Sequence, residues 1–172
     1  MLSKNNGIIV VVVLLLVLAC SEAAQSATIR DSGRANQMFS DARQFENQGE
    51  LEQAYQSYRQ AFELDPTHFR AVYRAGRLLH QMGYLSDAIA AMQRTLAIAP
   101  DFYPAHSTLG KLLVDSGFMQ AAVEAYRRGV EAAPDMPSAW RNYARALAET
   151  GALQQAVTAY ECAVELDPTH ES

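Results

Sequence analysis

The sequence lacks an excess of basic residues, a cluster of metal-ligating side chains and a glycine-rich loop of the kind that holds phosphate. Its 172 residues contain 14 Lys and Arg against 19 Asp and Glu, and the net charge of −5 argues against generic nucleic-acid binding. The four histidines are scattered, so a nucleophile, a base and an orienting group cannot be assembled. We therefore expect no enzymatic activity and no bound metal or cofactor.

What the sequence does have is a 34-residue period. Three kinds of small or turn-forming residue recur at this interval without a slip. They are the prolines Pro66, Pro100, Pro134 and Pro168, the glycines Gly49, Gly83, Gly117 and Gly151, and the alanines Ala54, Ala88, Ala122 and Ala156. A period of this length indicates stacked supersecondary units, so we expect one repeat domain rather than one globular core.

Apolar residues inside each repeat have helical spacing. In the second repeat Val72, Ala75 and Leu79 form one face of a helix, and Gly83 suits the turn that ends it. The same spacing recurs along a second helix, which Pro100 closes. Each repeat is therefore predicted to be an antiparallel helix hairpin.

The last two repeats carry a recognisable set of residues. They are His106, Leu109, Gly110, Leu113, Gly117, Ala122, Tyr126 and Pro134, and then Trp140, Tyr143, Ala144, Leu147, Gly151, Ala156, Tyr160 and Pro168. With these residues the sequence resembles the tetratricopeptide repeat family. The resemblance implies an all-α fold, a right-handed α-solenoid of four helix hairpins. Their predicted ranges are residues 35–68, 69–102, 103–136 and 137–170.

Packing should use most of the periodic residues. Gly76 and Gly110 are small enough to let the two helices of a hairpin approach closely. Bulky residues at one position of the second helix should fill the space between hairpins: Tyr58, Met92, Tyr126 and Tyr160. We interpret these residues as core rather than as functional side chains.

The N-terminal residues 1–19 are predicted to be an export signal, because Lys4 precedes an apolar run from Ile8 to Ala19. This run is too short to cross a hydrocarbon core of about 30 Å. It ends in Leu-Val-Leu-Ala-Cys20, which resembles the lipobox of bacterial lipoproteins. The resemblance implies a palmitate-type lipid anchor on Cys20 in the outer membrane, with the protein facing the periplasm. Ordinary cleavage to a secreted or periplasmic soluble protein and an uncleaved anchor stay open.

Residues 20–34 connect the cysteine to the first repeat. They are small and polar apart from the isolated Ile29, so they predict a flexible tether. An extra helical segment in the last few residues is the alternative.

A basic residue with the same period gives the main functional signal. Arg43, Arg77, Lys111 and Arg145 stand 34 residues apart, at a position that lines the concave groove of similar arrays. Further groove candidates are Arg70, Tyr73, Arg74, Arg141 and Asn142. Because guanidinium groups bind carboxylates in bidentate fashion, this ladder predicts an acidic peptide or protein partner. A solvated ladder, inherited by duplication of one repeat, is the alternative.

The last predicted helix offers a second candidate surface. No further helix follows it in the sequence, so Val157, Tyr160 and Val164 should be uncovered. Homodimer formation or another contact through this face, or a locally frayed monomer, are the possible consequences. Cys162 lies beside it, as a small helix residue or as the site of an intermolecular disulfide in the periplasm.

These features together predict a non-enzymatic adaptor of the bacterial cell envelope that binds an acidic partner in a basic groove. Similarity to envelope lipoproteins of this architecture implies assembly work on a pilus, a secretion channel or a cell-wall complex. Two alternatives stay open. One is a regulator of an envelope enzyme such as a peptidoglycan hydrolase, and the other is a subunit docked through the C-terminal helix.

Overall fold

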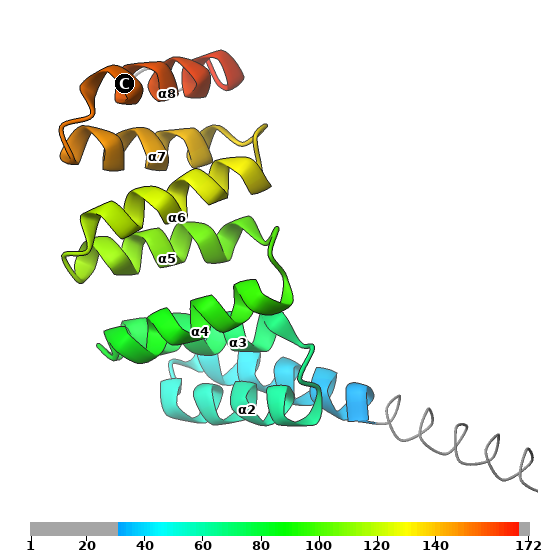
Figure 1. Cartoon of the computed structure of the whole chain (residues 1–172). Coiled ribbons are helices and arrows are strands. Elements are labelled where there is room, and N and C mark those ends of the chain that lie inside the picture. The colour runs from blue at the N-terminus through cyan, green and yellow to red at the C-terminus, as the bar shows by residue number, and fades with distance from the viewer. Residues whose placement is uncertain (1–30, 169–172) are drawn as a thin grey trace, which may run out of the picture.

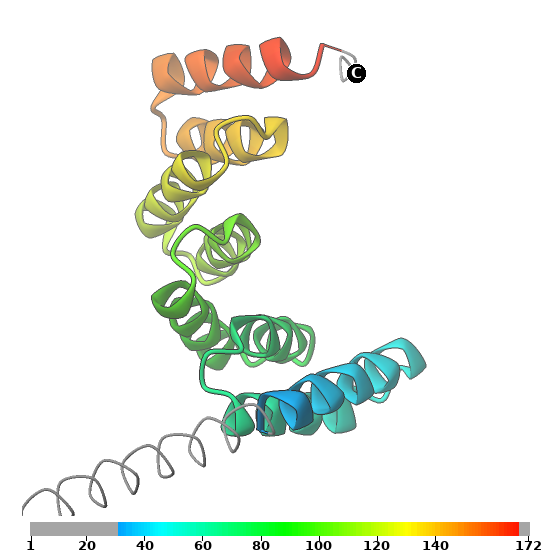
Figure 2. The ribbon, with the colours of Figure 1, turned by 90° about the vertical axis from the view of Figure 1, so that its right-hand side faces the viewer.

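The computed structural model describes residues 31–168, which form eight helices and no strand. The first helix occupies residues 31–48 of this range. The others are α2 (Leu51–Leu64), α3 (Phe69–Gln81), α4 (Leu85–Ile98), α5 (Tyr103–Asp115), α6 (Met119–Ala132), α7 (Pro137–Glu149) and α8 (Leu153–Leu166). Each helix packs against the next one in the chain, and the stack follows a curve (Figure 1 and Figure 2). The fold is the right-handed α-solenoid of helix hairpins that the sequence predicts.

The glycine of each repeat ends the first helix of its hairpin. Gly49, Gly83, Gly117 and Gly151 all have positive φ, between 78° and 86°. Side chains rarely adopt this left-handed conformation, so glycine is the residue that lets the chain reverse there. The predicted role of Gly83 is confirmed.

Two glycines inside helices allow close contact between the helices of a hairpin. A Cβ atom at Gly110 would lie 2.6 Å from the ring of Tyr126, and one at Gly76 would lie 2.4 Å from the end of Met92. Met92 and Tyr126 are buried, as is Tyr58 in the first repeat. These packing predictions are confirmed for Tyr58, Met92 and Tyr126. The fourth residue of the series, Tyr160, is 41% exposed, which agrees instead with the expectation that this face of the last helix is uncovered.

At the start of the described chain, the structure agrees with the alternative of an extra helical segment rather than with a tether. Residues 31–34, assigned to the tether, are helical and continue into the first hairpin. Asp31 and Arg34 form an ion pair one turn apart, and the next residue, Ala35, is fully buried. The proposed signal, Cys20 and the rest of the tether lie outside the described residues. Among the described helices, none has the length and apolar character needed to cross a membrane.

Candidate peptide-binding groove

The inner side of the curve carries the first helix of each hairpin. In Figure 2, α3 and α5 lie on this inner side, and α4 and α6 lie on the outer side. Arg77 on α3, Lys111 on α5 and Arg145 on α7 are all exposed. Because the repeats stack in register, residues 34 positions apart come from neighbouring inner helices.

These three basic residues meet in one cleft of about 420 Å³. Nine residues line it: Arg77, His80, Gln81, Ser107, Thr108, Lys111, Tyr126, Asn142 and Arg145. None of them is acidic, although the whole chain has more acidic than basic residues. A partner's carboxylate entering this cleft would meet three cations and no carboxylate on its lining.

Polar side chains inside the cleft hold one another in place. The Asn142 amide donates to the Ser107 hydroxyl over 3.2 Å, and the Arg145 guanidinium donates to the Asn142 oxygen over 3.5 Å. Burial raises the pKa of Tyr126, and the nearby Arg145 opposes this shift. Tyr126 therefore keeps its hydroxyl proton at neutral pH and can donate to an anionic ligand.

Two carboxylates, those of Asp115 and Glu149, lie near the cleft without lining it. Asp115 forms a 3.1 Å contact with His80, which links α5 to α3. A neighbouring cavity of about 270 Å³ shares Lys111, Tyr126 and Arg145 with the cleft and is also lined by Asp115 and Glu149. A bound segment that extends along the groove would therefore pass from a basic to a mixed surface.

Residues 47–113 and residues 107–171 match two family models, both described as tetratricopeptide repeat. The helix hairpins are tetratricopeptide repeats. Such repeats stack into extended concave surfaces that bind other proteins, so the array is suited to protein–protein interaction.

Solved structures of similar fold include several of the protein MamA. A crystal structure of MamA superposes with a TM-score of 0.73 and 22% identity, over 86% of each chain. A structure of MamA from Desulfovibrio magneticus RS-1, residue 41 to the end, gives a TM-score of 0.69 and 20% identity. The alignment covers 80% of this chain and 78% of the MamA chain. At this identity the similarity shows a shared fold. No curated protein matches the sequence.

The tetratricopeptide array places some predicted groove residues outside the cleft. Arg74 forms an ion pair with Glu46 at 3.3 Å, and Arg141 lies 3.9 Å from Asp167. Both guanidinium groups already face a carboxylate of the same chain. Their positive charge is therefore partly neutralised before any partner binds.

The remaining candidates have other contacts. Tyr73 packs edge-on against Phe102, and its hydroxyl lies 3.4 Å from that of Thr108. The guanidinium of Arg70 lies 5.4 Å from the centre of the Phe69 ring, while Arg43 is exposed on the first helix. These residues do not line the cleft. Of the nine groove residues predicted from sequence, those that line it are Arg77, Lys111, Asn142 and Arg145.

Several cleft residues do not stand out in the sequence pattern. The sequence pattern assigns Tyr126 to packing alone, yet in the structure it both fills the space over Gly110 and lines the cleft. His80, Gln81 and Thr108 were not identified as groove residues. Each of them lies one helical turn from Arg77 or Lys111, on the same face of the helix. This spacing is the sequence signal that could have identified them as groove residues.

The predicted second surface lies on α8. Val157, Tyr160 and Val164 are 50%, 41% and 46% exposed, whereas Cys162 is half-buried. The opposite side of α8, formed by Ala156 and Ala159, packs onto α7.

Among the described residues, no group of three or more His, Cys, Asp or Glu could hold a metal ion.

Proposed function

We propose that this chain is a non-enzymatic adaptor that binds an acidic segment of a partner protein in the cleft formed by α3, α5, α6 and α7. The observation that carries the proposal is the lining of that cleft. Three cations from three consecutive repeats converge there with hydrogen-bond donors, and no acidic residue lines it. Carboxylates of a partner would offset the mutual repulsion of Arg77, Lys111 and Arg145.

A pull-down from cell-envelope extract tests this proposal. The double variant Arg77→Glu/Lys111→Glu should lose the partner, because it reverses the charge of two of the three cations. The matched control is Arg34→Glu/Arg59→Glu, which makes the same charge change at side chains that are 68% and 53% exposed outside the cleft. Equal loss of the partner in both variants would show that net charge, rather than the cleft, governs binding.

We also propose that the protein works in the cell envelope. The support is the sequence alone: the apolar run from Ile8 to Ala19 followed by Cys20. A lipid anchor on Cys20 would hold the array at the outer membrane facing the periplasm, and assembly of a pilus, secretion channel or cell-wall complex would suit such a place. Labelling with radioactive palmitate should mark the wild type and not Cys20→Ser, and an unlabelled wild type would favour a secreted or periplasmic protein. Regulation of an envelope enzyme is the alternative function.

A second candidate function rests on the exposed apolar side chains of α8. Val157, Tyr160 and Val164 would be covered if this helix docked onto a second copy or onto a larger complex. Sedimentation of the repeat domain at tens of micromolar should then show a dimer that Tyr160→Glu dissociates. A monomer with unchanged behaviour in the variant would exclude self-association, and absence of a reducible dimer on non-reducing gels of native membranes would exclude a Cys162 disulfide.

A further inference from the structure

A larger cavity lies on the outer side of the array, where the second and third repeats meet. Its volume is about 600 Å³, and it shares no lining residue with the cleft. Its apolar lining includes Leu96 of α4, Leu109 and Leu113 of α5 and Ala125 of α6. The adaptor function proposed above does not use this cavity.

The corresponding place between the first and second repeats is filled by the chain itself. There Phe62 occupies the position of Leu96, and Arg94 occupies the position of Arg128. The guanidinium carbon of Arg94 lies 4.2 Å from the centre of the Phe62 ring, a stacked cation–π geometry. The cavity remaining there is about 280 Å³.

The following junction also contains large aromatic groups. Trp140 stands 34 residues after His106, and Tyr143 stands 34 residues after Leu109. The Trp140 indole N–H donates to the Pro134 carbonyl over 2.8 Å, and His106 Nε2 donates to the Pro100 carbonyl over 2.7 Å. His106 thus reproduces the hydrogen bond of tryptophan with a smaller ring. The middle junction thus has Leu96 where the preceding junction has Phe62, and His106 and Leu109 where the following junction has Trp140 and Tyr143. At the last two positions the preceding junction has the smaller Val72 and Ala75.

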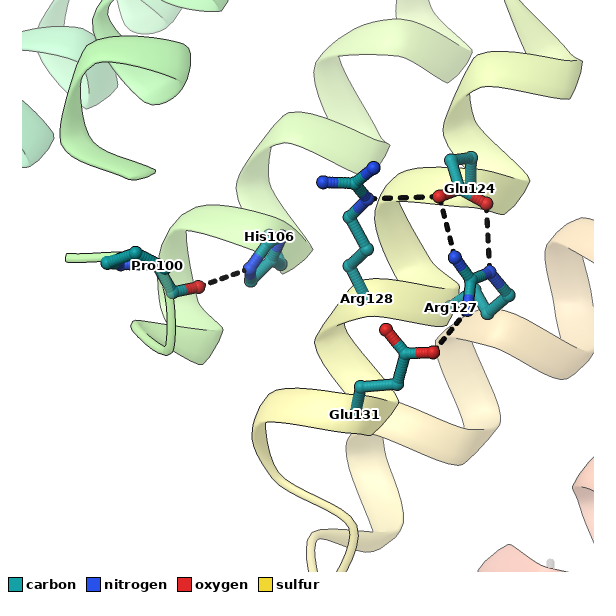
Figure 3. Close-up of polar contacts among 6 residues, drawn as sticks. All are labelled: Pro100, His106, Glu124, Arg127, Arg128 and Glu131. Atoms are coloured by element: carbon teal, nitrogen blue, oxygen red, sulfur yellow. Dashed lines mark hydrogen bonds and ion pairs between the residues drawn. The ribbon is translucent and has the colours of Figure 1, made fainter. Parts of the chain in front are cut away.

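The rim of this outer cavity, between the second and third repeats, is charged. Figure 3 shows Glu124 accepting hydrogen bonds from Arg127 and Arg128, and Arg127 also contacts Glu131. The position of Glu124 is held by Ala90 in the repeat before, so Arg94 has no such acceptor one turn away and stacks on Phe62 instead. Arg128 is 62% exposed and is attached only to Glu124 among the described residues.

Acidic groups outnumber basic groups around this cavity. Asp101, Glu124 and Glu131 line it together with Arg127 and Arg128. The two guanidinium groups pair with the two glutamates, while the exposed Asp101 carboxylate forms no ion pair or side-chain hydrogen bond within residues 31–168. A partner segment with a basic residue would therefore complement the rim.

We propose that this outer cavity binds an aromatic side chain of a partner protein, in a segment where a basic residue stands next to the aromatic one. The ring occupies the space that Phe62 fills in the preceding junction, against Leu96, Leu109 and Ala125. Arg128 stacks over the ring as Arg94 does over Phe62, and Asp101 pairs with the basic residue. The array then has two binding surfaces of opposite preference, an acidic segment in the inner cleft and an aromatic–basic segment outside.

The test uses amide resonances of the repeat domain titrated with N-acetyl-Lys-Phe-Lys amide, with N-acetyl-Lys-Ala-Lys amide as the matched control. The Phe peptide should shift the amides of Leu96, Leu109 and Ala125, and the Ala peptide should leave them in place. Leu96→Phe, which copies the first repeat, should weaken binding by about ten-fold or more because it fills the site. His106→Trp, which copies the fourth repeat, provides a second filled variant should Leu96→Phe fold poorly.

Binding of the Phe peptide should persist in Arg77→Glu/Lys111→Glu, so failure of this proposal and failure of the inner cleft are distinguishable. Equal shifts by the Phe and Ala peptides would overturn the outer site. So would undiminished binding in both filled variants, or shifts confined to the inner cleft.

Discussion

Glu46 and Arg74 form an ion pair that links the first helix to α3, with 3.3 Å between the carboxylate and the guanidinium. The Tyr58 hydroxyl donates to the same carboxylate over 2.7 Å. The side chains of Arg74 and Glu46 are 33% and 21% exposed, so this network is shielded from water more than a surface pair is. Arg74 therefore supports the packing of the first two repeats, whereas Arg77, one turn further along α3, faces the cleft.

Substitution of these two arginines should separate stability from binding. Arg74→Gln should lower the free energy of unfolding by about 1–3 kcal/mol, because it leaves the half-buried Glu46 without its cation, and should change peptide binding little. Arg77→Gln should change stability by less than about 0.5 kcal/mol and weaken binding of an acidic peptide. Urea unfolding and fluorescence anisotropy measure the two effects. The opposite pattern would mean that Arg74 belongs to the binding surface.

Gly110→Ala should destabilise the array by about 1–3 kcal/mol. A Cβ at this position would lie 2.6 Å from the rigid ring of Tyr126, so α5 and α6 would have to separate. Gly33→Ala is the control, because a Cβ there would meet no atom within 4 Å apart from its chain neighbours and the backbone of its own helix, and alanine favours a helix over glycine. Thermal unfolding should place the two variants on opposite sides of the wild type, and similar midpoints would contradict the close contact.

Tyr58 should make stability sensitive to alkaline pH. Burial and the hydrogen bond to Glu46 raise the pKa of Tyr58 above its ordinary value. The pKa of tyrosine in the unfolded chain is about 10. Because the pKa of Tyr58 is higher in the folded state, its contribution to the free energy of unfolding is complete below about pH 10 and is lost as the pH rises from there through the pKa of the folded state. Between about pH 9 and pH 11 the wild type should therefore lose more stability than Tyr58→Phe, which retains Tyr126 as the other buried tyrosine. Parallel pH profiles would contradict this account.

His106→Trp should raise the free energy of unfolding by about 1–2 kcal/mol. The indole N–H can donate to the Pro100 carbonyl as Trp140 does to Pro134. The substitution also removes His106 Nδ1, a buried acceptor that has no hydrogen-bond partner within residues 31–168. His106→Ala should have the reverse effect, because it loses the hydrogen bond and enlarges the cavity. A destabilised tryptophan variant would show that the junction has no room for the larger ring.

The fold could be predicted from sequence because each periodic residue has a local physical role. Chain reversal requires glycine at the positions with positive φ, and close contact with Tyr126 requires glycine at position 110. Both kinds of glycine recur with the 34-residue period, so a single sequence reveals them. The site was less predictable. Whether a basic residue is free depends on carboxylates far away in the chain, such as Glu46 for Arg74.

The outer cavity could not be predicted from the period either. Leu96 and His106 fit the helical pattern as well as Phe62 and Trp140 do, and only the structure shows that a large cavity lies beside them. Tyr126 shows the same limit, because its packing role hides the hydroxyl that lines the cleft. Sequence periodicity identifies positions, whereas side-chain volume and distant partners decide what those positions do.

Binding of an acidic segment in the inner cleft is the central property proposed for this protein. Its most direct test is fluorescence anisotropy of a labelled hexaglutamate peptide, titrated at low and at moderate salt with the repeat domain and with Arg77→Gln/Lys111→Gln/Arg145→Gln. The wild type should bind, more weakly as salt screens the charges, and the triple variant should bind about ten-fold or more weakly. Equal affinity of the two proteins, or no binding by the wild type at low salt, would contradict the account.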